Sequence, residues 1–125
     1  MVSRRHNTVR EESIGRPAAF LVPSLKLKQR GKDGQPLEEN LHGYLLETFG
    51  GYTAAAGNIF GYWKDKSGNE FYGEHRRFEV GLLDEDKLPE LKRFLAGLAD
   101  EMGEQCIYLQ TGEEALFVYG NHSTD

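Results

Sequence analysis

The sequence predicts an α+β domain in which an antiparallel sheet carries two helices on one of its faces. Apolar residues recur at helical spacing in two stretches, 37–49 and 86–102, and a glycine follows each stretch directly. Strand-like segments lie before, between and after these helices. Two of the segments, 52–64 and 70–83, flank a short polar turn and are therefore expected to form a hairpin.

A charged arm precedes the first expected strand. Residues 1–16 carry many charges and few apolar side chains, so we expect a flexible arm outside the domain. From 18 to 28 apolar and polar residues alternate, and the apolar positions are Phe20, Val22, Leu25 and Leu27. Pro23 interrupts the alternation, which indicates a bulge or an edge position.

The first helix, 37–49, has its apolar residues at helical spacing and ends before Gly50, a residue suited to the position past a helix end. Gly43 weakens this helix by about 1 kcal/mol relative to alanine. We interpret Gly43 as a point of close packing against the sheet.

The hairpin has its turn at 65–69, where Gly68 supplies the positive φ that such turns need. In the return strand Phe78, Val80 and Leu82 alternate and are expected to face the core. Small residues at 50–51 and 54–57 allow a close backbone approach, either to a ligand or between strand and helix. Of these two interpretations we favour packing.

Asp86 is the expected N-cap of the second helix. Strands follow at 105–110 and 115–119, and residues 121–125 form a polar tail. The order of strand, helix, strand, strand, helix and strand, with one strand appended, is that of a ferredoxin-like sandwich, which we assign to one domain over 17–120. The sheet face opposite the helices is open in this plan, so apolar residues there call for a partner subunit.

Composition narrows the class of protein. The chain has 125 residues, a formal charge of -5 and one cysteine, Cys106. The acidic balance argues against nucleic-acid binding, and a single cysteine allows no internal disulfide, which favours a reducing compartment. No apolar run reaches the about 20 residues of a membrane span, and the first residues lack the apolar core of a signal peptide. We therefore expect a cytoplasmic protein that binds neither nucleic acid nor membranes.

Neither a metal site nor an activated nucleophile is expected. The four histidines are far apart and none pairs with another at helical spacing. Cys106 has no evident base, and there is no Gly-x-Ser-x-Gly motif. On the return strand, however, Glu70, Tyr72 and Glu74 alternate and share one face, where carboxylates could hold a cation or act as a general base. A solvated strand face completed by Arg76 accounts for the same pattern and is the simpler interpretation.

Three segments between residues 49 and 119 carry a resemblance to a known family. They are Gly51-Tyr52 leading through small residues to Gly61-Tyr62, the acidic strand with Glu70 and Glu74 ahead of Arg77-Phe78-Glu79-Val80, and the second helix running into Glu104-Gln105-Cys106-Ile107-Tyr108. In these segments, a little over half of the chain, the sequence resembles the bacteriophage enzymes that degrade S-adenosylmethionine, long called hydrolases and now understood as lyases.

The resemblance implies cleavage of S-adenosylmethionine to methylthioadenosine and homoserine lactone, without metal or cofactor, between the subunits of a homotrimer. The substrate's own carboxylate displaces the sulfonium, so the protein has to fold the substrate and hold its positive charges. By this resemblance the catalytic side chains are Glu70, Glu74 and Gln105, and the substrate-binding side chains are Tyr52, Tyr62, Tyr72 and Glu104. A phage origin would place the enzyme in the cytoplasm of the host cell.

Gln105 departs from the family pattern, because an acid is expected at or next to this position. Either Glu104 supplies the charge, or the site is weakened, or a Glu→Gln replacement at 105 has produced an inactive form that still binds. The alternative to an enzyme is a non-enzymatic phage or bacterial ferredoxin-like module that binds a host protein or a small nucleotide. The lack of an independent catalytic triad or metal set favours that alternative.

Overall fold

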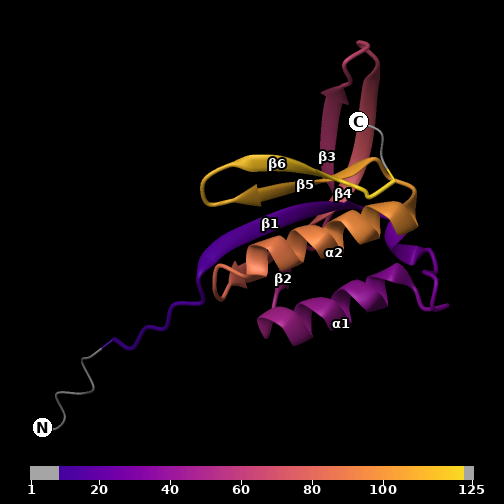
Figure 1. Ribbon diagram of the computed structural model, residues 1–125. Coiled ribbons are helices and arrows are strands. Elements are labelled where there is room, and N and C mark those ends of the chain that lie inside the picture. The colour runs from indigo at the N-terminus through magenta and orange to yellow at the C-terminus, as the bar shows by residue number, and fades with distance from the viewer. Residues whose placement is uncertain (1–8, 123–125) are drawn as a thin grey trace, which may run out of the picture.

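The computed structural model describes residues 9–122, which form one sheet with two helices on one of its faces (Figure 1). The strands are β1 (Arg16–Pro23), β2 (Thr53–Ala54), β3 (Ile59–Lys64), β4 (Glu70–Leu82), β5 (Cys106–Thr111) and β6 (Ala115–Tyr119). The helices are α1 (Leu37–Phe49), α2 (Lys87–Met102) and a short 3-10 helix, η2 (Leu25–Lys28). All strand pairs are antiparallel in the order β2-β4-β1-β5-β6, and β3 pairs with β4.

This arrangement confirms the predicted ferredoxin-like sandwich. The central strand β1 lies between β4 and β5, and Phe20 is paired with Phe78 on one side and with Leu109 on the other. Phe20 is fully buried, and its ring stacks on that of Phe78 with the ring centres 5.6 Å apart. The alternating residues of β4 that were expected in the core are buried as predicted, so the strand faces were assigned correctly.

The helices span the stretches expected from their apolar spacing. Both end at a glycine with positive φ, Gly50 at 79° and Gly103 at 71°, as predicted. Asp86 is the N-cap residue of α2, but its side chain makes no capping hydrogen bond. The two helices contact each other through the stacked rings of Tyr44 and Phe94, whose centres are 3.8 Å apart.

The alternation predicted through residue 28 ends earlier in the structure. After Pro23 the chain turns into η2, where Leu27 is buried and Leu25 is 86% exposed. The bulge inferred for Pro23 is wrong, but the edge position is confirmed, because Pro23 is the last residue of β1 and pairs with β4 alone. The ladder with β5 stops at Leu21, so proline at this end interrupts no pairing with β5.

The continuous extended segment predicted over 52–64 is broken in two. Residues 55–58 connect β2 to β3 and lie opposite only Arg76 and Arg77, so this edge has two surplus residues, as in a β-bulge. Added Cβ atoms at Gly50, Gly51 and Gly57 would meet nothing within 4 Å. These glycines therefore permit no tight strand–helix packing, and the packing interpretation that we favoured is wrong for them.

Gly43 also lies in open space rather than against the sheet. It is exposed, and an added Cβ would meet no atom within 4 Å. The close packing inferred for this glycine is wrong.

Replacing Gly43 with alanine is therefore expected to stabilise the protein by about 0.5–1 kcal/mol, because alanine loses less backbone entropy in a helix. Thermal and urea unfolding would measure the change. Gly50→Ala is the matched control, since its surroundings are equally open but its φ of 79° disfavours a side chain. Gly50→Ala should destabilise the protein, and equal effects at both positions would contradict this account.

The predicted N-terminal arm and C-terminal tail fall partly outside the described residues, which exclude 1–8 and 123–125. Residues 9–15 are exposed and precede β1. At the other end, Asn121 and His122 donate backbone hydrogen bonds to the Asp100 carboxylate at 3.1 and 3.2 Å, which ties the chain after β6 to α2.

Candidate active site

The hairpin of β3 and β4 extends beyond the rest of the sheet (Figure 1). Its strands pair from Ile59 and His75 at the base to Lys64 and Glu70 near the turn. Side chains directly opposite each other in an antiparallel pair share a face. The hairpin therefore has two faces, one continuous with the helix-covered face of the sheet and one continuous with its open face.

The predicted acids and two of the predicted tyrosines lie together on the helix-side face of the hairpin. The rings of Tyr62 and Tyr72 are 5.1 Å apart, and Phe60 stacks on Tyr72 at 6.1 Å. The Tyr72 hydroxyl donates to Glu74 Oε2 at 3.3 Å. We name this set of Phe60, Tyr62, Tyr72 and Glu74 the acidic-aromatic cluster. It confirms the shared face that the alternation predicted.

The surroundings of Tyr72 in the acidic-aromatic cluster change the pKa of its phenol. Local desolvation and the adjacent Glu74 carboxylate raise the pKa of Tyr72. Tyr72 therefore stays protonated at neutral pH and acts as a hydrogen-bond donor toward Glu74.

Glu70 lies further out, paired with Lys64 near the turn. A depression of about 220 Å³ at this end is lined by Tyr62, Trp63, Lys64, Glu70 and Phe71. All five side chains are exposed. In a single chain this part of the hairpin is open to solvent, so it could bind a small molecule only if something else covered it.

Glu104 and Gln105 lie directly before β5, at the hairpin base. Glu104 Oε2 is 3.0 Å from Lys26 Nζ. The backbone carbonyl of Gln105 accepts the Gly120 N–H at 3.0 Å. Burial lowers the pKa of His75, and the charge of Glu104 opposes that effect. Because Lys26 already pairs with Glu104, this carboxylate is poorly placed to replace an acid missing at 105.

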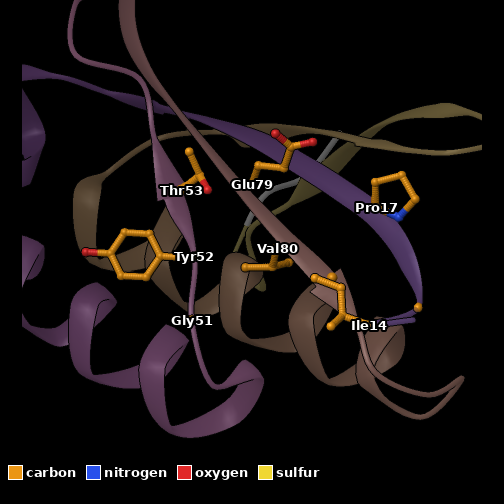
Figure 2. Close-up of a pocket in the computed structure, with 9 residues that line it drawn as sticks. Ile14, Pro17, Gly51, Tyr52, Thr53, Glu79 and Val80 are labelled. Carbon is orange, nitrogen blue, oxygen red and sulfur yellow. The ribbon is translucent and has the colours of Figure 1, made fainter. Parts of the chain in front are cut away.

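Tyr52 is not part of the acidic-aromatic cluster in one chain. Its neighbour Thr53 pairs with Glu79, five residues along β4 from Glu74, which corresponds to roughly 17 Å. The Tyr52 hydroxyl is 2.8 Å from His42 Nδ1. The ring points away from Ile14 and Pro17, which line a depression of about 280 Å³ with it (Figure 2).

Two contacts at the hairpin base were not predicted from the sequence. The side chain of Asn58 donates to Glu74 Oε1 at 3.4 Å, and the Ser24 hydroxyl donates to Asn58 Oδ1 at 2.6 Å. The only sequence signal for them is the Gly57-Asn58 pair, which is typical of a turn or bulge.

The part of the chain that the structure describes contains no group of three or more His, Cys, Asp or Glu side chains that could hold a metal ion. Within the same residues, no helix is long and apolar enough to cross a membrane. The acidic-aromatic cluster can attract a cation by charge and by the faces of its rings.

The fold and this cluster define an α+β sandwich with a projecting acidic and aromatic hairpin. The same fold occurs in a solved phage SAM lyase in complex with S-methyl-5'-thioadenosine, which matches with a TM-score of 0.56 and 13% identity over 92% of this chain and 97% of that chain. No protein-family model and no curated protein sequence matches the chain. The structural match supports, at the level of fold, the resemblance found in the sequence.

Proposed function

We propose that this protein degrades S-adenosylmethionine to methylthioadenosine and homoserine lactone. The observation that carries the proposal is the acidic-aromatic cluster, in which Tyr62, Tyr72 and Glu74 lie together. It is supported by the fold that this chain shares with a phage SAM lyase solved with the thioether product of such a reaction. The host cytoplasm, where the substrate is made, is the compartment that this function implies.

The chemistry needs no nucleophile from the protein. An oxygen of the substrate carboxylate forms a bond to Cγ of the methionine chain, and the Cγ–S bond breaks with its electron pair going to sulfur. The products are a five-membered lactone and a neutral thioether, so atoms and charges balance without an added proton or cofactor. The protein has to hold the substrate with carboxylate, Cγ and sulfur in line, which can supply several kcal/mol of the barrier.

The charges suggest a division of roles. The sulfonium loses its charge during the reaction, so an acid held against sulfur would stabilise the substrate more than the transition state. The α-ammonium keeps its charge, and a carboxylate bound there costs nothing in rate. We assign the ammonium to Glu74 and the sulfonium to the faces of Tyr62 and Tyr72, whose cation–π attraction is weaker than that of a carboxylate and therefore stabilises the substrate less. Glu70, Gln105 and Glu104 complete the proposed set at the two ends of the hairpin.

The site would be completed by neighbouring subunits of a homotrimer. In one chain Tyr62 is 79% exposed, and the acidic-aromatic cluster faces solvent. A substrate held there would be surrounded by water, which weakens every charge interaction. A second copy that covers the hairpin would exclude water. Its Tyr52 would then lie close to the acidic-aromatic cluster of the first copy.

The test is to incubate the protein with S-adenosylmethionine and follow methylthioadenosine, homoserine lactone and homoserine by chromatography and mass spectrometry. Lactone that precedes homoserine is expected of a lyase, whereas homoserine without lactone indicates hydrolysis. Gln105→Glu is expected to raise kcat/KM by about 10-fold, since it restores an acid at the hairpin base. Gln110→Glu, exposed near the other end of β5, is the matched control and should leave the rate unchanged.

Absence of product from both the wild-type protein and Gln105→Glu, together with absence of substrate binding, would refute the enzyme. The non-enzymatic alternative is favoured by one observation, the pairing of Glu104 with Lys26, because the residue next to Glu104 is an amide, Gln105, rather than an acid. Tight binding of S-adenosylmethionine or methylthioadenosine without turnover would support a nucleotide-binding module. Capture of one stoichiometric host protein, without any nucleoside binding, would support a protein-binding module.

A further inference from the structure

Glu74 is held from three separate segments of the chain. Its Oε2 accepts the Tyr72 hydroxyl from its own strand, and its Oε1 accepts the Asn58 amide from the connection between β2 and β3. Its backbone carbonyl accepts the Ser24 N–H at 3.0 Å from the end of β1. Each carboxylate oxygen thus has its own donor, one from β4 and one from the connection between β2 and β3.

The bulge explains why Asn58 reaches Glu74. Residues 55–58 include two more residues than the opposing stretch of β4, and a bulge redirects side chains near it. Asn58 is the last of these residues, directly before β3 begins. It therefore lies at the point where the hairpin leaves the body of the sheet.

Ser24 determines which end of the Asn58 amide faces Glu74. An asparagine side chain has an oxygen that accepts and an NH₂ group that donates. The Ser24 hydroxyl donates to Asn58 Oδ1 at 2.6 Å, so the NH₂ group is the end left for the carboxylate. Without the hydroxyl the amide could turn, and its oxygen would then repel Glu74.

We propose that Asn58, oriented by Ser24, is a positioning residue that fixes the carboxylate of Glu74 for the reaction proposed above. This inference rests on the proposed function and adds two residues to it. Asn58 and Ser24 act through Glu74 and need not touch the substrate. A glutamate on an exposed strand otherwise rotates freely, and a misplacement of about 1 Å is enough to reduce a rate by as much as about 100-fold.

The experiment compares Asn58→Ala, Ser24→Ala and Ser24→Thr in the full-length chain. Asn58→Ala is expected to lower kcat/KM by about 10-fold, and Ser24→Ala to lower it by a smaller factor. Ser24→Thr keeps the hydroxyl and should have the rate of the wild-type protein. Asn40→Ala is the matched control, because it removes a similar amide-to-carboxylate contact, to Asp33 Oδ1 at 3.3 Å, far along the chain from the hairpin.

A double-mutant cycle with Glu74→Gln separates positioning from a general structural role. If Asn58 acts through Glu74, adding Asn58→Ala to Glu74→Gln should have little further effect. Fully multiplicative losses, or a loss in Asn40→Ala equal to that in Asn58→Ala, would overturn the proposal.

A second measurement does not depend on activity. The side-chain amide resonances of Asn58 in ¹⁵N NMR spectra are expected to shift in both Ser24→Ala and Glu74→Gln. Unchanged resonances would overturn the proposed contacts of Asn58 with Ser24 and Glu74, even if the enzyme is active. If the wild-type protein makes no methylthioadenosine, the proposed function is refuted, and with it the catalytic role of Asn58 and Ser24. If the wild-type protein and Asn58→Ala convert S-adenosylmethionine at the same rate, only this inference is overturned and the proposed function stands.

Discussion

Glu74→Gln is expected to reduce kcat/KM for S-adenosylmethionine by about 100-fold. The replacement keeps the size of the side chain but removes the negative charge that we assign to binding the substrate ammonium. Loss of one partner from a buried, hydrogen-bonded charge pair, as this pair would be in the proposed trimer, typically costs about 2–5 kcal/mol. At about 1.4 kcal/mol for each factor of ten, that range includes 100-fold. Steady-state measurement of methylthioadenosine formation would give the value.

The same replacement at two other glutamates makes this result interpretable. Glu70→Gln should have a smaller effect, because Glu70 lies at the outer end of the hairpin opposite Lys64. Glu47→Gln, exposed on α1, should have none. Since Glu74 is exposed, its variant should unfold at the temperature of the wild-type protein. A variant as active as the wild type would remove Glu74 from the site.

Leu27→Ala is expected to destabilise the protein by about 2–5 kcal/mol, because Leu27 is 1% exposed and belongs to the core. Leu25→Ala makes the same deletion two residues earlier, where the side chain is 86% exposed, and should change stability by less than about 0.5 kcal/mol. Urea unfolding of both variants would measure the difference. Similar losses at the two positions would mean that the segment continues β1 as a strand, as the sequence suggested.

The sequence was sufficient for the parts of the fold with a clear period. The helix over 37–49 has a buried residue on nearly every turn and a glycine past its end, and the structure has the same bounds. The return strand alternates strictly, so the core positions and the shared face of Tyr72 and Glu74 followed from the period of two. These elements were predictable because local pattern and tertiary packing agree.

The predictions that were wrong concern segments without a local pattern of apolar residues that would determine their structure. Leu25 and Leu27 are spaced like strand residues, and a single 3-10 turn is too short to show a period of its own. Residues 55–58 are small or polar, so no apolar face determined their register. The pairing of Lys26 with Glu104 joins residues far apart in the sequence, and only the folded chain brings them together.

The surplus at residues 55–58 also tells where this chain can change length. A residue added or lost inside β3 would shift part of the strand by one position, and each shifted side chain would move to the other face of the hairpin. The Ala55 N–H donates to the Arg77 carbonyl at 2.9 Å, so a residue added or lost at 56–57, after this bond and within the stretch that has surplus residues, would leave the pairs of β3 with β4 unchanged. Natural relatives that differ in length along this edge should therefore carry their insertions and deletions there, with the tyrosine-bearing surface unchanged.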